Sequence, residues 1–257
     1  MASYTLALLP GDGIGADVMA EAEKILDVIE KETPIELERN TIPCGGQYYS
    51  ETGKEWPDGS FAFCRDEADA ILLGAIGWPG VVTKDGDLAG GEVILGLRSG
   101  LDLYANVRPI RLYEGITHKV HGQFTQMWKP GSVDMTIVRE NTEGLYYALL
   151  KRSAEKALGG SGWEPDSMEF PGLDSEVAWD PRPISRKGSE RVIRYAFELA
   201  QRRNGAPIDG KRRVTCVDKS NVTRGCQLFR QIFSEISDEY TGTETNMAYI
   251  DAFTMWL

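Results

Sequence analysis

The stretch TLALLPGDGIGADVMAEAEKIL, residues 5–26, decides the fold class. It predicts a short apolar strand, a glycine-rich turn and a helix, which is how a βαβ unit begins. Gly11, Gly13 and Ala16 also satisfy the permissive G-x-G-x-x-G/A pattern, in which glycines let a pyrophosphate approach a helix N-terminus. A tight strand-to-helix turn needs glycine for backbone reasons alone, because glycine adopts positive φ at little cost. The loop is therefore either a phosphate cradle or a plain turn, and the rest of the chain must decide.

The residues that follow continue the alternation of helices and strands. Apolar side chains recur at helical spacing over residues 16–30, Val18, Met19 and Ile25 among them, and predict an amphipathic helix that covers a sheet. The apolar run AILLGAIG, residues 70–77, is typical of a parallel strand buried on both faces. This order indicates a doubly wound α/β domain.

The second half of the chain predicts further strands and helices around one irregular segment. LDLYANVRPI, residues 101–110, alternates apolar and polar side chains, as expected of a strand covered on one face. Residues 152–187 are rich in glycine, proline, serine and tryptophan and predict an extended arm. Residues 189–205 predict a helix with Ser189 as its N-cap. Further strands are predicted at SVDMTIVRE (132–140), RRVTCVD (212–218) and NMAYI (246–250), the last two leading into helices.

Composition excludes several classes of protein. The formal net charge of −11 argues against a general nucleic-acid binder, which would carry a basic excess. The four cysteines are too few and too widely spaced for a disulfide framework or a zinc ribbon. Without a basic leader or a long apolar run, we expect a cytoplasmic protein that does not bind membranes. His118 and His121 lie in a polar stretch, THKVHG, and are expected to be exposed.

Charged residues follow several of the predicted strands, where ligands bind in open α/β sheets. Arg108 and Arg139, together with Arg98 on the preceding helix, would suit a small substrate with more than one carboxylate, because guanidinium groups bind carboxylates in a bidentate manner. Each arginine taken alone also fits a surface ion pair. Lys219 follows TCVD and could act as a base where neighbouring cations lower its pKa. Asp251 follows MAYI and fits either a divalent-metal ligand or the N-cap of the last helix.

Six ordered blocks of sequence resemble the isocitrate and isopropylmalate dehydrogenase family. They are LLPGDGIG (8–15), LLGAIG (72–77), LRSGLDLYANVRP (97–109), VRENTEGLYY (138–147), VDKSNV (217–222) and YIDAFTM (249–255). The family oxidises a (2R)-hydroxy acid with NAD or NADP and releases a carboxylate as carbon dioxide, with Mg²⁺ or Mn²⁺. The resemblance implies a homodimer whose active sites are shared between subunits.

The same resemblance implies an α/β, isopropylmalate dehydrogenase-like two-domain fold. Residues 1–99 would form the N-terminal part of the cofactor-side domain, without its C-terminal return. Residues 100–257 would form the substrate and dimerisation domain, with the arm at 152–187.

Residue roles carry over from the matching blocks. Arg98, Arg108 and Arg139 would hold the substrate carboxylates, and Tyr146 would protonate the enol left by decarboxylation. Lys219 would take the hydroxyl proton. The remaining matches are cofactor contacts at Ile14 and Asn221 and a metal ligand at Asp251, with Lys219, Asn221 and Asp251 coming from the partner subunit. The glycines of GDGIG then become turn residues beside the nicotinamide end of the cofactor.

The family pattern continues past Asp251 with two further metal aspartates and an adenosine-binding loop, which we expect this chain to lack. Two hypotheses follow: a fragment of a metal-dependent dehydrogenase, or a catalytically inactive truncated homologue that acts as a dimerisation or regulatory partner. Ile94 and Leu95 could line an apolar pocket, whereas Glu92 would repel an extra carboxylate. These residues favour a 3-isopropylmalate-like or malate/tartrate-like substrate over isocitrate, with NAD as the default cofactor and NADP possible.

Overall fold

The computed structural model describes residues 2–84, 86–151, 177 and 179–256. The chain divides into two compact units. One unit is built on Met1–Asp102 with the stretch that begins at Ala148, and the other on Leu103–Tyr147 with the C-terminal stretch. Most of the expected arm, residues 152–176 and 178, lies outside the described residues.

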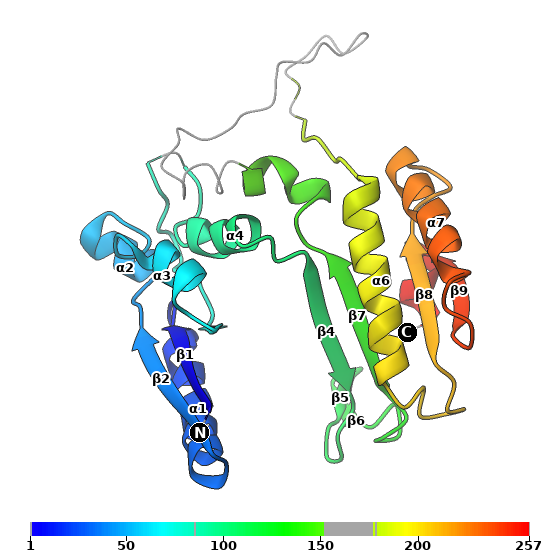
Figure 1. Ribbon diagram of the computed structural model, residues 1–257, viewed down its shortest axis with the longest axis horizontal. Coiled ribbons are helices and arrows are strands. Elements are labelled where there is room, and N and C mark those ends of the chain that lie inside the picture. Colours follow the sequence, from blue (N-terminus) through cyan, green and yellow to red (C-terminus); the bar gives the residue numbers. More distant parts are fainter. Residues whose placement is uncertain (1, 85, 152–176, 178, 257) are drawn as a thin grey trace. The chain divides into compact units, whose positions relative to one another are not determined.

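The first unit is a three-stranded parallel sheet with helices (Figure 1). Its elements are β1 (Ala2–Leu9), α1 (Ile14–Glu32), β2 (Ile35–Thr41), α2 (Gly46–Thr52), α3 (Ser60–Asp66), β3 (Ala70–Leu73) and α4 (Gly91–Gly100). The strand order is β2-β1-β3, so the quoted strand is the central one. Parallel strands need a crossover connection, and α1 supplies it between β1 and β2. The mixed α/β fold expected from the sequence is confirmed.

The GDGIG loop is held by backbone packing. A Cβ atom added at Gly11 or Gly15 would lie 2.1 or 2.2 Å from a carbonyl oxygen, that of Ala75 or Pro10 respectively. Asp12 is 2 % exposed, and its carboxylate accepts hydrogen bonds from the N–H groups of Gly46, Gln47 and Gly77 at 2.8, 2.8 and 2.9 Å. The N–H groups of Asp12, Gly15 and Ala16 donate to carbonyl oxygens nearby. These glycines therefore serve a tight turn, and three of the loop amides already have partners within the protein.

Two expectations for the first unit were wrong in detail. The strand AILLGAIG is shorter than predicted and lies at the sheet edge, with Leu73 38 % exposed, because pairing to β1 ends there. Val18 and Ile25 on α1 point to solvent, whereas Met19 is buried. The helix itself was predicted correctly, but its buried side contains Met19 and not Val18 or Ile25.

The second unit contains two separate two-stranded sheets and an exposed hairpin. Its elements are β4 (Ala105–Arg111), β5 (His118–Val120), β6 (Gln123–Thr125), β7 (Asp134–Glu140), the 3₁₀ helix η1 (Gly144–Tyr146), α6 (Arg186–Arg202), β8 (Arg213–Asp218), α7 (Arg224–Ser237), β9 (Glu244–Tyr249) and α8 (Ile250–Trp256). Strands β4 and β7 pair antiparallel, and β8 and β9 pair parallel. Figure 1 shows α6 lying along these strands, beside α7.

Aromatic side chains on α6 and α7 form the core of this unit. Phe197 is fully buried and stacks on Phe233, with ring centroids 5.5 Å apart, and on Tyr240 at 4.7 Å. Val138 of β7 and Cys216 of β8 pack against the same cluster. Burial of each phenylalanine contributes about 1.5–3 kcal/mol, so this cluster stabilises the packing of α6 and α7 on strands β7 and β8.

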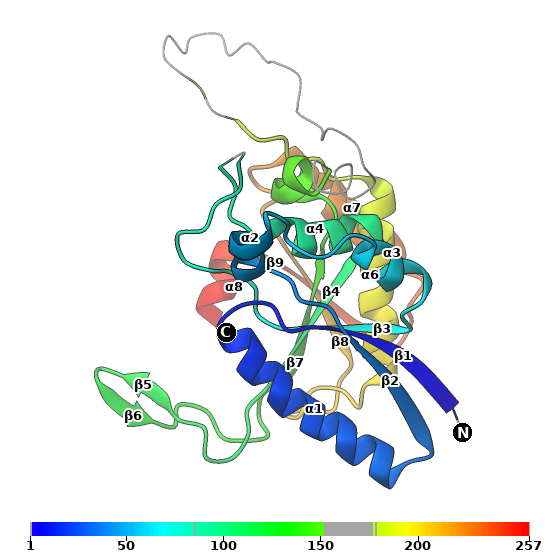
Figure 2. The same ribbon diagram turned by 90° about the vertical axis from the view of Figure 1, so that its left-hand side faces the viewer.

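The start of α6 and the THKVHG stretch also differ from expectation. Ser185, not Ser189, is the N-cap of α6, and its hydroxyl accepts a hydrogen bond from the Gly188 N–H at 3.0 Å. His118 begins β5, a strand not predicted, and its ring packs edge-on against Trp128 at 5.0 Å. His118 is therefore half-buried, although His121 is exposed as expected. Figure 2 shows the β5–β6 hairpin extending from the ends of β4 and β7.

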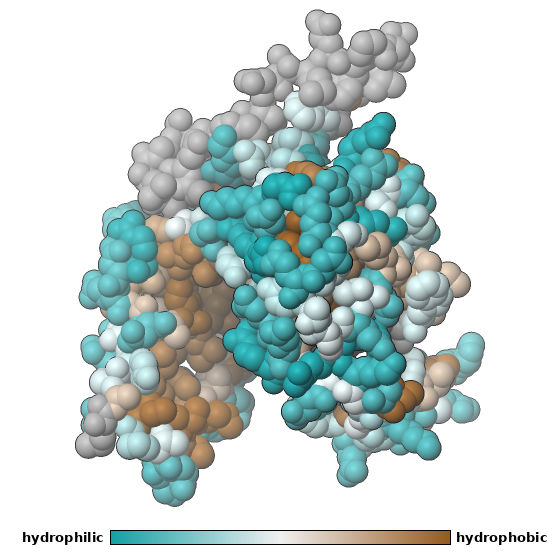
Figure 3. All heavy atoms as spheres, turned by 45° about the vertical axis from the view of Figure 1, so that its right-hand side comes forward, coloured by the Kyte–Doolittle hydropathy of each residue, from teal (hydrophilic) through white to brown (hydrophobic). Residues whose placement is uncertain are grey.

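On the face that Figure 3 shows, apolar side chains reach the surface in patches among hydrophilic ones. Of the helices in the described residues, none has both the length and the apolar character needed to cross a membrane.

Candidate active site

The β4–β7 ribbon has one face toward α6 and one open face. Its register pairs Asn106 with Arg139 and Arg108 with Ile137. Directly paired residues of antiparallel strands share a face, so both arginines lie on the same side as diagonal neighbours. On the opposite side, Val138 packs into the core. The ribbon therefore brings together the predicted substrate arginines of this unit.

Two asparagines link these arginines. The Arg108 Nε donates to the Asn106 Oδ1 at 3.0 Å, and an Arg139 Nη donates to the Asn141 Oδ1 at 2.8 Å. The Asn106 side-chain amide donates in turn to the Asn141 Oδ1 at 3.4 Å, and Asn141 is anchored on the Leu103 carbonyl oxygen. Each guanidinium group is thereby held by an asparagine on its own face of the ribbon.

Sequence reasoning missed both asparagines. A signal was present, because each stands two residues from an arginine on a predicted strand and hence on the same face. Both also lie within the blocks ANVRP and VRENTEG that carry the resemblance.

Tyr146 lies at the end of η1, within reach of Arg139. The Arg139 guanidinium carbon is 6.0 Å from the centre of the Tyr146 ring, at the outer limit of a cation–π contact, and the tyrosine is 52 % exposed. The turn before it is held by Glu140, whose carboxylate accepts from the N–H groups of Thr142 and Glu143 at 2.8 and 2.7 Å. The Glu143 carboxylate then accepts from the Ser185 N–H at 2.8 Å. The Tyr146 phenol thus follows a turn that is held by hydrogen bonds. It lies beside the face of β4–β7 that carries Arg108 and Arg139, which we call the arginine face.

Lys219 and Asp251 meet at the carboxyl ends of β8 and β9. These parallel strands pair Asp218 with Tyr249, so the residues just beyond them emerge side by side. The Lys219 Nζ lies 2.6 Å from the Asp251 Oδ1. That hydrogen bond from the lysine lowers the pKa of Asp251 below its ordinary value. Helix α8 begins at Ile250, so Asp251 lies in the first turn and not at the N-cap.

The loop after β8 is folded by its own backbone. The Asp218 Oδ1 accepts from the Ser220 N–H at 2.7 Å, and the Lys219 carbonyl oxygen accepts from the N–H groups of Val222 and Thr223, both at 3.0 Å. Asn221 stands at the tip of this turn and is exposed. Its predicted contact with a cofactor stays a prediction.

Arg98 and Ile14 belong to the first unit. Arg98 is half-buried in the last turn of α4, and Ile14 is the exposed first residue of α1. The first turn of α4 is anchored by Glu55, whose carboxylate accepts from the Glu92 N–H at 2.7 Å. Burial raises the pKa of Glu55 above its ordinary value. Roles for Arg98 and Ile14 in ligand binding stay predictions.

The described residues do not by themselves fit a complete divalent-metal site. They contain no group of three or more His, Cys, Asp or Glu side chains placed to hold one ion. Mg²⁺ and Mn²⁺ require several oxygen ligands, and Asp251 supplies one carboxylate. A metal at Asp251 would need further ligands.

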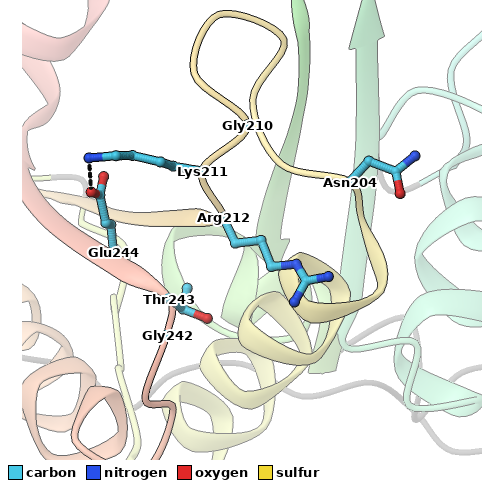
Figure 4. Close-up of a pocket in the computed structure, with 7 residues that line it drawn as sticks. All are labelled: Asn204, Gly210, Lys211, Arg212, Gly242, Thr243 and Glu244. Atoms are coloured by element: carbon cyan, nitrogen blue, oxygen red, sulfur yellow. Dashed lines mark hydrogen bonds and ion pairs between the residues drawn. The ribbon is translucent and has the colours of Figure 1, made fainter.

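A hollow of about 580 Å³ lies at the opposite ends of β8 and β9 (Figure 4). It is lined by Asn204, Gly210, Lys211, Arg212, Gly242, Thr243 and Glu244. Lys211 and Glu244 form an ion pair there, with 2.5 Å between the Nζ and Oε1 atoms. Lys219 and Asp251 leave the other ends of the same two strands, so the hollow is separate from the candidate site.

Known proteins are similar to this chain over most of its length. The family model described as isocitrate/isopropylmalate dehydrogenase matches residues 5–257. A 3-isopropylmalate dehydrogenase of Thermotoga maritima is 34 % identical over 98 % of this chain and 63 % of its own length, and one of Corynebacterium efficiens is 37 % identical over 98 % and 64 %. The chain thus spans just under two thirds of these curated relatives.

Solved structures are also similar to this chain over most of its length. An isocitrate dehydrogenase from Methylococcus capsulatus superposes with a TM-score of 0.69 at 29 % identity, covering 98 % of this chain and 62 % of that one. The apo form of a β-decarboxylating dehydrogenase from Thermococcus kodakarensis superposes with a TM-score of 0.62 at 30 % identity, covering 98 % and 59 %.

Proposed function

This chain belongs to the isocitrate/isopropylmalate dehydrogenase family, and on that premise we propose that it takes part in the oxidative decarboxylation of a (2R)-hydroxy acid. The observation that carries the proposal is the open face of β4–β7, where Arg108 and Arg139 are linked through asparagines and Tyr146 lies beside them. Paired guanidinium groups on one face suit a small ligand with more than one carboxylate.

Each residue has one task in this proposal. Arg108 and Arg139, with Arg98, bind and orient the carboxylates, which aligns the bond to be broken. Lys219 accepts the hydroxyl proton, and Tyr146 donates a proton to the carbon that loses the carboxylate. The oxidation requires a hydride acceptor, for which we propose NAD, with NADP possible. The site would be completed in a homodimer, with Lys219, Asn221 and Asp251 supplied across the two-fold axis.

We propose a 3-isopropylmalate-like or malate/tartrate-like substrate. Ile94 and Leu95 on α4 are only partly buried and remain available to line an apolar pocket. Glu92 in the first turn of the same helix would repel an additional carboxylate. The two relatives quoted above are 3-isopropylmalate dehydrogenases, which supports a 3-isopropylmalate-like substrate.

A second candidate function is that of a non-catalytic dimerisation or regulatory partner of a full-length relative. Association with such a relative, without turnover by the chain alone, is the result expected from this alternative.

An activity panel tests both functions. NAD and NADP reduction is followed with 3-isopropylmalate, malate, tartrate and isocitrate in the presence of Mg²⁺ or Mn²⁺, for the chain alone and mixed with a full-length relative. Arg108→Gln should lower kcat/KM by about 100-fold, because a charge-assisted contact to a substrate carboxylate is lost. Arg111→Gln is the matched control, since Arg111 ends the same strand and pairs with Asp134 at 3.0 Å.

The outcomes separate the candidates. Equal activity of the Arg108→Gln and Arg111→Gln variants would contradict the assignment of the arginine face. Turnover by the chain alone supports the catalytic proposal, and inactivity alone combined with stable association supports the partner.

A further inference from the structure

We infer that Arg230 of α7 is a positioning residue that keeps Lys219 beside Asp251. Its guanidinium group binds Asp218, the last residue of β8, through two hydrogen bonds. The Nε donates to the Asp218 Oδ2 at 2.7 Å, and an Nη donates to the Asp218 Oδ1 at 3.0 Å. The Asp218 side chain is 1 % exposed, so this bidentate pair is shielded from water on the carboxylate side.

The same guanidinium group also contacts the end of β9. Its carbon atom lies 4.8 Å from the centre of the Tyr249 ring, within the range of a cation–π contact. Tyr249 is the last residue of β9 and the register partner of Asp218. One side chain therefore touches the final residue of both strands, immediately before Lys219 on one strand and two residues before Asp251 on the other.

The ion pair between Lys219 and Asp251 needs such support. Its side chains are 33 % and 65 % exposed, and an exposed ion pair is screened by water and does little to order the backbone that carries it. Asp218 also accepts from the Ser220 N–H, which fixes the direction of the chain just past Lys219. The distance between the Lys219 amine and the Asp251 carboxylate therefore depends on the contacts that Arg230 makes with the ends of both strands.

Arginine is required for this task by its shape. A planar guanidinium group can offer two parallel N–H groups to a carboxylate while its face rests on an aromatic ring. A lysine ammonium group is a point charge and cannot do both. The proposal rests on the proposed function for the roles of Lys219 and Asp251, and it assigns Arg230 no contact with substrate.

Zero-length cross-linking with a water-soluble carbodiimide measures the geometry directly. The reagent joins an amine to a touching carboxylate as an amide with loss of water, and peptide mass spectrometry identifies the pair. Two cross-links are expected between β8 and β9 and their extensions: Lys219 to Asp251, and Lys211 to Glu244 at the amino ends of the strands. The second is an internal reference, because general loosening of the fold lowers both yields.

Three variants give the test. Arg230→Gln should lower the ratio of the Lys219–Asp251 to the Lys211–Glu244 cross-link by about tenfold, because the bidentate charge-assisted bonds are lost. Arg230→Lys should give an intermediate ratio. Arg194→Gln should leave the ratio unchanged, since Arg194 forms a similar two-bond ion pair with Glu239, an acidic residue outside this cluster.

An unchanged ratio in folded Arg230→Gln protein, or an equal fall in Arg194→Gln, would overturn the inference. Where Arg230→Gln does not fold, Arg230→Lys takes its place, since it keeps a cation beside Asp218 but cannot donate two parallel N–H groups, and an unchanged ratio in that variant would overturn the inference. The ratio needs no turnover. If no activity is found in the panel but the cross-link ratio falls as expected in Arg230→Gln, the proposed function is wrong and the positioning role of Arg230 is supported.

Discussion

Replacement of Asp218 by asparagine should reveal how strongly the end of β8 depends on one buried carboxylate. Asp218 accepts two hydrogen bonds from Arg230 and one from the Ser220 N–H. Removal of one partner of a buried ion pair costs roughly 3–5 kcal/mol. The Arg230 side chain is 25 % exposed, and asparagine keeps one acceptor oxygen. We therefore expect Asp218→Asn to lower the free energy of unfolding by about 2–3 kcal/mol at neutral pH.

The pH dependence of this loss has a definite sign. Burial alone would raise the pKa of Asp218, but the hydrogen bonds from Arg230 and Ser220 outweigh it and hold the pKa below its ordinary value. The charged carboxylate therefore stabilises the folded state fully above the unfolded aspartate pKa of about 3.9. That contribution is lost as the pH falls through the lower folded-state pKa. The difference between the parent protein and Asp218→Asn should shrink with increasing acidity.

Urea unfolding followed by circular dichroism at pH 7 and at about pH 3, below the pKa of an unfolded aspartate, measures both quantities. Glu239→Gln serves as the control, because its ion pair with Arg194 is exposed and should contribute little at either pH. A loss below about 1 kcal/mol at pH 7, or an equal loss at both pH values, would refute the reasoning that the carboxylate acts as a buried, charged acceptor.

Three further predictions concern residues that shape the units. Asp12→Asn should lower the free energy of unfolding by about 2 kcal/mol, because an amide donor would replace one of the oxygens that accept backbone N–H groups. Urea unfolding measures this loss, and an unchanged midpoint would contradict the role of Asp12 in joining these three backbone segments. Ser185→Ala should cost about 1 kcal/mol through loss of the α6 cap, whereas Ser185→Thr, which keeps the hydroxyl, should cost less in the same assay. Iodoacetamide at pH 8 should alkylate Cys226 before Cys216, as read by peptide mass spectrometry. Burial raises the pKa of Cys216 to about 12. Burial would also raise the pKa of Cys226, but hydrogen bonds from Thr223 and Arg182 outweigh it and leave that pKa lowered. Faster alkylation of Cys216 than of Cys226 would contradict this prediction.

Sequence spacing predicted the positions of Lys219 and Asp251 because both follow apolar strands of a parallel pair. Parallel strands place their carboxyl ends at one edge, so residues that are 32 positions apart meet there. The contact with Arg230 was not predicted, since it depends on how α7 packs over β8. Helical periodicity indicates which face of α7 is buried but not which strand residue lies under a given arginine.

The asparagines of the arginine face show a second limit. Their effect depends on the exact register of β4 and β7, and register is set by long-range pairing that alternation within one strand does not specify. The cap of α6 shows a third limit. Ser185 and Ser189 both precede plausible helical turns, and the hydrogen bond to Gly188 together with the contact to Glu143 selects the earlier one.

The two faces of the β4–β7 ribbon make it intolerant of insertions. Side chains alternate between the faces with a period of two, so a single residue added within β4 before Asn106 would turn Arg108 toward α6 and expose the opposite row. A guanidinium group would then be forced against an apolar core, and the ligand face would lose a charge in the same event. Related genes should therefore differ in length in the β5–β6 hairpin between these strands while keeping the spacing from Asn106 to Arg108 and from Arg139 to Asn141 unchanged.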